Sequence, residues 1–171
     1  MGCNATTVRD LLLYMLWADR LILAAVRRVP PTDLNREAGV SFGSLLGTMA
    51  HMLASQRLWL SRFLGNPLGS IPTLDETPDL PSWIAEWEET ASQIEAFVAG
   101  LSDDQLASPL TWKSIPDGEE HTLPLWQPVV HLVNHTTYHR GYVADMFYQV
   151  PARPPTTDLP VFLRDVSLSM D

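Results

Sequence analysis

The chain has 171 residues and a formal net charge of −9, from 20 acidic and 11 basic side chains. Hydrophobic residues make up 46% and charged residues 18%, which fits one globular domain spanning 1–171 with a buried core. The acidic balance, with no basic cluster longer than Arg27-Arg28, excludes nucleic acid as an expected partner, because duplex binding depends on clustered cations.

The sequence also predicts no membrane partner. Its longest apolar runs stop well short of the ~20 residues that span a bilayer, and its first residues lack the pattern of a secretory signal. We therefore expect a cytoplasmic location. Cys3 is the single cysteine, so it cannot form an intramolecular disulfide, and we interpret it as incidental.

Two long helices are predicted in the first part of the chain. Apolar residues recur at helical spacing from a cap near Thr7 to position 29, just before two prolines. A second stripe begins near Ser41 or Ser44 and continues to position 64, where a glycine, an asparagine and a proline end it. This second helix carries His51.

Two more long helices follow after a proline- and glycine-rich connection. The third begins at Asp79 or Ser82, and its apolar stripe ends near Leu101. Positions 102–105 can cap one short turn, and segments 110–112 and 121–123 flank a turn at 116–118, which predicts a small hairpin. The fourth helix is expected over 126–148, and 159–166 favours a short closing helix.

These elements predict an all-α fold. Four helices with one apolar stripe each bury those stripes by packing as a four-helix bundle. The connections before and after the third helix are long, so an up-down-down-up arrangement with crossovers is as admissible as simple up-and-down. The small hairpin precedes the last long helix.

Three of the five histidines lie on the fourth helix at a spacing of four residues: His131, His135 and His139. Side chains four apart are offset by about 40° around a helix and by about 6 Å along it, so two such imidazoles can hold one ion. Imidazole is a common ligand of zinc, nickel and iron. The alternative is that these are hydrogen-bonded core or boundary residues.

A catalytic centre of the zinc type needs three protein ligands and an open position. His51 is the best candidate for the third, because small residues surround it and bundle sites are built from facing helices. It could instead be hydrogen-bonded across a close helix contact. His131 is too far along the helix, by about 12 Å from His139, to share the ion. We expect it to line the pocket or to support the ligands.

Other side chains have weaker interpretations. Trp17 and Trp112 either fill the core or wall a ligand pocket, and core filling is favoured. Arg140 is displaced around the helix from the ligands, which favours a salt bridge or dimer contact over an anion clamp. His121 is expected to be exposed. No His-Glu-x-x-His pattern occurs, which disfavours proteolysis.

Together these motifs resemble the DinB/YfiT family of metal-binding four-helix proteins. Segment 131–141 is similar to the closing signature of the family, and segment 14–20 is similar to its first-helix pattern. Segment 51–59 resembles its histidine-bearing second helix, and positions 117–118 with 122–123 resemble the segment before its last helix. The likeness spans nearly the whole chain. One departure is Tyr142, where the family often has glutamine, and this affects the pocket or dimer surface rather than the ligands.

The resemblance implies zinc or nickel held by His51, His135 and His139, and a homodimer. The family name refers to DNA-damage inducibility and implies no DNA binding. Characterised relatives include metal-dependent transferases that use a low-molecular-weight thiol, such as mycothiol, bacillithiol or glutathione, on small-molecule substrates. The leading hypothesis is therefore a thiol S-transferase in detoxification or stress response. The alternatives are a metal-dependent hydrolase of a small substrate and a non-catalytic metal-binding dimeric scaffold.

Overall fold

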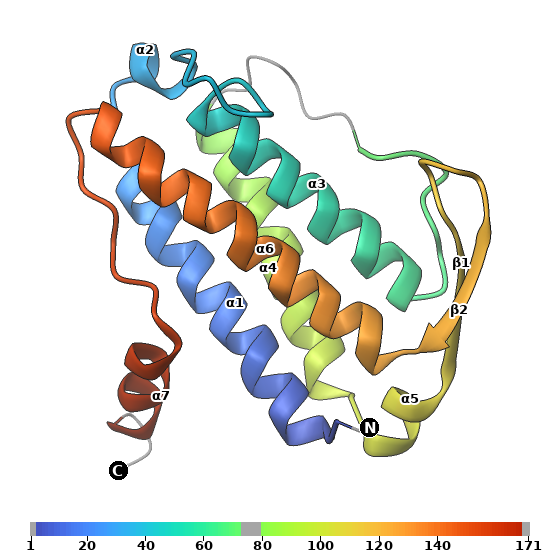
Figure 1. Cartoon of the computed structure of the whole chain (residues 1–171). Helices are drawn as coiled ribbons and strands as arrows, with labels where there is room; N and C mark the ends of the chain where they lie inside the picture. Colours follow the sequence, from blue (N-terminus) through green and yellow to red (C-terminus); the bar gives the residue numbers. More distant parts are fainter. Residues whose placement is uncertain (1–2, 73–79, 169–171) are drawn as a thin grey trace.

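The computed structural model describes residues 3–72 and 80–168, and within them it is a helical fold with one two-stranded sheet (Figure 1). The elements in chain order are α1 (Ala5–Val26), α2 (Pro31–Leu34), α3 (Leu45–Phe63), α4 (Leu80–Ala99), α5 (Asp103–Ala107), β1 (Pro109–Lys113), β2 (Glu120–Pro124), α6 (Trp126–Met146), the 3₁₀ turn η1 (Phe147–Gln149) and α7 (Leu159–Leu168). The predicted all-α fold is confirmed.

The four long helices form a bundle in which α1 contacts α6 and α4, and α3 contacts the same two helices. Figure 1 shows α1 and α6 running in one direction, and α3 and α4 running in the other. The arrangement is therefore up-down-down-up, one of the two topologies that the connections allowed. Its consequence for function is that α3 and α6, which carry the histidines, are antiparallel neighbours.

The predicted element boundaries differ from the observed ones by a few residues. The first helix ends at Val26 rather than at 29, and the four-residue α2 that follows was not predicted. The fourth helix gives way to the η1 turn after Met146. Asp79, the alternative start of the third helix, lies outside the described residues.

The caps and the hairpin follow the sequence signals. The Ser44 hydroxyl accepts a hydrogen bond from the Gly47 amide at 3.0 Å, which fixes the start of α3. Ser102 and Gln105 form a capping box at the start of α5. Strands β1 and β2 pair antiparallel, with Leu110 opposite Leu123, and they lead directly into α6.

The core consists of two apolar clusters, one towards each end of the bundle. One is built around Trp83, Trp87 and Phe147, and the other around residues such as Leu12 and Leu132. Helix α7 lies against α1 through Phe162. None of the described helices is sufficiently long and apolar to cross a membrane.

Candidate metal centre

Helices α3 and α6 bring three histidines together at the middle of the bundle. His51 lies two turns into α3, downstream of the Ser44 cap. His135 and His139 lie one turn apart on α6, whose Pro128 falls within the first turn, where a missing amide proton costs little. Because the two helices are antiparallel neighbours, His51 faces the pair on α6.

The three imidazoles form one compact group. His51 Nε2 and His135 Nε2 are 3.2 Å apart. The ring centroids of His51 and His139 are 4.6 Å apart, and those of His135 and His139 are 4.4 Å apart. One nitrogen of each ring lies within 4.8 Å of one nitrogen of each of the others. The structure brings these three side chains together, as the sequence predicts.

The environment keeps the rings neutral. Burial, followed by the nearby His139, lowers the pKa of His51 from 6.5 to about 4. Burial and the neighbouring histidines likewise lower the pKa of His135 to about 4, and burial lowers the pKa of His139. A neutral imidazole keeps a nitrogen lone pair free for a metal ion, so the electrostatics and the geometry favour the same chemistry.

The donor set fits a divalent cation. Nitrogen ligands at about 2.0–2.1 Å around a tetrahedral ion lie about 3.3 Å from one another, close to the 3.2 Å between the nitrogens of His51 and His135. Nδ1 of His139 is buried and has no hydrogen-bond partner among the described residues. No fourth histidine, cysteine or carboxylate of the described residues joins the group, so a four-coordinate cation held by the three imidazoles would take its fourth ligand from a small molecule.

The model of the DinB family matches residues 1–166. The chain belongs to the DinB family. It is also similar to Protein DinB of Bacillus subtilis (strain 168), with 26% identity over 155 residues that cover 88% of this chain and 90% of the relative. The resemblance seen in the sequence motifs is thus confirmed at the level of the family.

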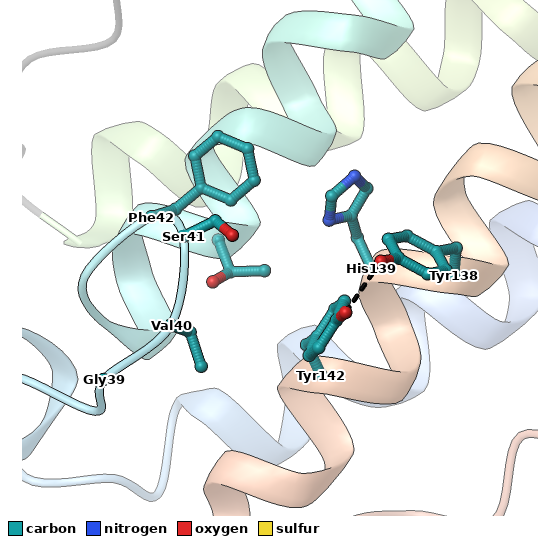
Figure 2. Close-up of a pocket in the computed structure, with 8 residues that line it drawn as sticks. Gly39, Val40, Ser41, Phe42, Tyr138, His139 and Tyr142 are labelled. Carbon is teal, nitrogen blue, oxygen red and sulfur yellow. Dashed lines mark hydrogen bonds between the residues drawn. The ribbon is translucent and has the colours of Figure 1, made fainter.

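A cavity of about 290 Å³ adjoins the histidine cluster of this DinB-family protein at His139 (Figure 2). Its lining consists of Gly39, Val40, Ser41, Phe42, Thr48, Tyr138, His139 and Tyr142. The Phe42 ring stacks on the His51 ring with centroids 4.0 Å apart and planes at 14°. On the other side, the hydroxyls of Tyr138 and Tyr142 share a hydrogen bond of 2.7 Å. One wall is therefore the loop before α3, and the other is α6.

Sequence reasoning missed most of this lining. Tyr142 was expected at the pocket or the dimer surface, and it lines the cavity. Tyr138 lies four residues before Tyr142, so the periodicity of α6 could have placed it on the same face. Phe42 gave no comparable signal, because it belongs to an irregular loop whose path depends on the fold. Its position is supported by Gly47, where an added Cβ would lie 2.1 Å from the Phe42 carbonyl oxygen.

The other sequence candidates lie around or away from the cluster. His131 is exposed, with its ring 5.9 Å from that of His135, and it packs on Trp59. Trp112 packs edge-on against Trp59 and lines a different cavity. Trp17 packs on Phe162 and is not among the residues that line the cavity beside the histidines.

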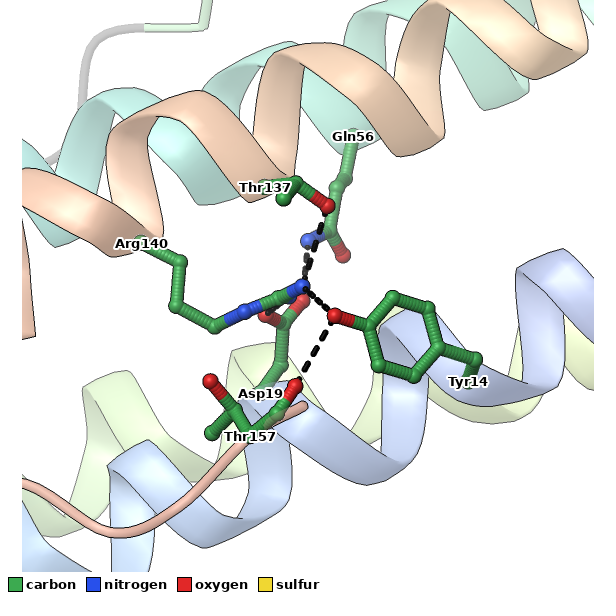
Figure 3. A network of polar contacts seen from close by, with 6 residues as sticks. All are labelled: Tyr14, Asp19, Gln56, Thr137, Arg140 and Thr157. Atoms are coloured by element: carbon green, nitrogen blue, oxygen red, sulfur yellow. Dashed lines mark hydrogen bonds and ion pairs between the residues drawn. The ribbon is translucent and has the colours of Figure 1, made fainter. Parts of the chain in front are cut away.

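Arg140 forms a salt bridge inside the chain, which is one of the two roles expected for it. Its guanidinium contacts the Asp19 carboxylate at 3.0 Å, and their side chains are only 2% and 1% exposed (Figure 3). Tyr14 and Thr137 accept further hydrogen bonds from Arg140, and Gln56 donates one to Asp19 at 2.7 Å. The network ties α1, α3 and α6 together beside the histidine pair. His121, as expected, is an exposed hairpin residue.

Proposed function

We propose that this DinB-family protein is a divalent-metal-dependent enzyme that joins an intact low-molecular-weight thiol through its sulfur to a small electrophile. The thiol gives up its proton, and the electrophile gives up its leaving group. His51, His135 and His139 are the proposed ligands of zinc or nickel. The observation that carries the proposal is the convergence of three neutral imidazoles beside a cavity, with no fourth protein ligand among the described residues. When bound, the cation supplies Lewis acidity that favours the deprotonated form of a thiol near neutral pH.

The walls of the cavity indicate the size and character of the substrate. Its volume of about 290 Å³ suits a small organic group rather than a polymer. Phe42 and Val40 offer apolar surface on one wall, while the Thr48 hydroxyl and the tyrosine hydroxyls offer hydrogen bonds. Phe42 also holds the His51 ring from one face, which limits its rotation and excludes water from that face.

The ligand set is tested by metal binding to the wild-type protein and to two matched variants. We expect one zinc or nickel ion per chain and a loss of at least about 100-fold in affinity for His135→Ala, since a three-ligand site loses one of its ligands. His131→Ala removes the imidazole one turn earlier on α6 and should leave the affinity unchanged. Equal loss in both variants, or none in either, would contradict the assignment of the ligands.

The reaction is tested with metal-loaded protein, an activated aryl halide, and glutathione, bacillithiol or mycothiol in turn. Formation of the thioether with loss of free thiol supports the transferase. A hydrolase remains the second candidate, because the same open coordination position also activates water. Product formation without any thiol would favour it. Metal binding with no turnover of any substrate would favour the non-catalytic scaffold. The proposed homodimer is tested separately by sedimentation.

A further inference from the structure

A second cavity lies at the hairpin end of α3, between β1 and the segment that follows α3. It has a volume of about 450 Å³ and is lined by, among others, Arg62, Leu68, Trp112, Lys113 and Glu120. Arg62 is eleven residues after His51 on α3, which places them about 16 Å apart along the helix axis. The cavity is thus separate from the metal centre. Trp112 of the hairpin packs on Trp59, and Trp59 in turn packs on His131.

Arg62 is a buried cation that has no carboxylate partner among residues 3–72 and 80–168. The residue is 7% exposed, and its guanidinium lies 4.6 Å over the Trp59 ring. Its one hydrogen bond to the described residues is from Nη2 to the Lys113 carbonyl oxygen, at 3.2 Å. It forms no ion pair with a carboxylate of the described residues. Burial accordingly lowers the pKa of the Arg62 guanidinium below its usual value.

The remaining donors of Arg62 are available to a ligand. A guanidinium has five N–H donors, and this one donates one hydrogen bond to the part of the chain that the structure describes. Arg62 lines the second cavity, so a ligand in that cavity can reach its guanidinium. Buried cations are normally paired, so a group that completes this one should be anionic.

The charge around the cavity favours a single oxyanion group. Lys113 and Glu120 are directly opposite each other on the paired strands, and both line the cavity. Neither forms an ion pair with a described residue. The cavity is lined by two cationic side chains and one carboxylate, so its local charge is positive, although the whole chain has a formal net charge of −9. The planar fork of an arginine matches the two oxygens of a carboxylate or phosphate.

We propose that this cavity binds the carboxylate or phosphate group of a small molecule, with Arg62 as the main contact and Lys113 as the second. This site is distinct from the histidine cluster and does not depend on the proposed thiol transfer. The Trp112 ring in its wall provides apolar surface for the part of the ligand next to the anionic group.

The test follows the Nε–H resonance of Arg62 in ¹⁵N-labelled protein during titration with inorganic phosphate, succinate or, at matched ionic strength, chloride. A few charge-assisted hydrogen bonds predict a dissociation constant on the order of 1 mM. Saturation by phosphate or succinate but not by chloride supports the proposal, and the tighter probe identifies the group. Linear, chloride-like shifts with both probes would overturn it.

Three variants sharpen the test. Arg62→Gln should weaken binding of the tighter probe by roughly tenfold or more. Because this variant lacks the Arg62 resonance, its binding is measured from the shifts of the other resonances in the spectrum. Lys113→Gln alters an exposed strand residue and should weaken binding by roughly threefold, so the test stands even where the Arg62 variant folds poorly. Arg57→Gln is the control, since Arg57 is a partly exposed α3 arginine that pairs with Glu86 outside this cavity. An equal loss with the control would mean nonspecific charge binding and would overturn the site.

Discussion

Metal binding by this protein should release almost no protons from two of its ligands at pH 5.5. The pKa values of His51 and His135 are about 4, instead of 6.5, chiefly because burial penalises the charged ring. At pH 5.5, a histidine with a pKa of 6.5 is protonated in about 91% of molecules, and one with a pKa of about 4 in about 3%. An unperturbed pair would release about 1.8 protons per metal ion, and this pair should release fewer than about 0.1.

The same shifts predict a flat pH profile of affinity. Because a lowered pKa extends the neutral, ligand-competent form to lower pH, the affinity should persist until the pH falls towards about 4. Between pH 7 and 5.5, protonation of an unperturbed pair would weaken binding by about 70-fold. For His51 and His135 the corresponding factor is less than about 1.2. The pKa of His139 is also lowered, so its contribution has the same sign.

Calorimetric titration of metal-free protein with zinc measures both quantities. Titrations at pH 7.0 and 5.5, each in two buffers of different ionisation enthalpy, separate the protons released from the heat of binding. With His139 included, ordinary pKa values would give a total release of about 2.7 protons at pH 5.5. A measured release above about 1.5 protons, or an affinity that falls by tens of fold, would refute the reasoning that burial and mutual proximity hold these rings neutral.

Three substitutions test the surroundings of the site. Arg140→Met leaves the Asp19 carboxylate buried without its partner and should cost about 3–5 kcal/mol at pH 8 in urea unfolding. Burial already raises the pKa of Asp19 to about 6, so the cost should shrink at pH 5, where the carboxyl takes up a proton; the same cost at both pH values would contradict this. Gly47→Ala places a Cβ against the Phe42 carbonyl and should cost about 1–3 kcal/mol and weaken zinc binding; unchanged stability would show that the loop is free to move. Ser44→Ala removes the cap of α3 and should cost about 1 kcal/mol in thermal unfolding, whereas a cost near zero would mean that water replaces the hydroxyl.

The sequence was sufficient to predict the helices and the meeting of the three histidines. Each long helix has a continuous apolar stripe and a local start or stop signal, so its existence depends on short-range physics. His135 and His139 share a face by helical geometry alone. The inclusion of His51 required a fold-level step, namely that its helix packs beside the fourth. The small residues around His51 and the habit of bundle sites to use facing helices indicated this step, and the family resemblance implied the same ligand.

Features that depend on tertiary packing were not predictable in the same way. The Phe42 stacking arises from an irregular loop, and no periodicity fixes where such a loop lies. The sequence did not decide whether Trp17 fills the core or lines a pocket, because an aromatic ring in an apolar stripe is typical of both. The partner of Arg140 was likewise open, since Asp19 lies 121 residues earlier and only the adjacency of α1 and α6 brings them together.

The buried polar network and the histidines form a polar layer between the two apolar clusters of the core. Gln56 is five residues after His51 on α3, and Arg140 directly follows His139 on α6. Asp19 on α1 contacts both Gln56 and Arg140, so it fixes α3 and α6 relative to each other at nearly the height of the ligands. Apolar contacts alone tolerate small sliding between helices, whereas a buried charged hydrogen bond is satisfied at one register. A centre whose ligands come from two helices needs that register, because a displacement of about 1 Å separates nitrogens that must share one ion.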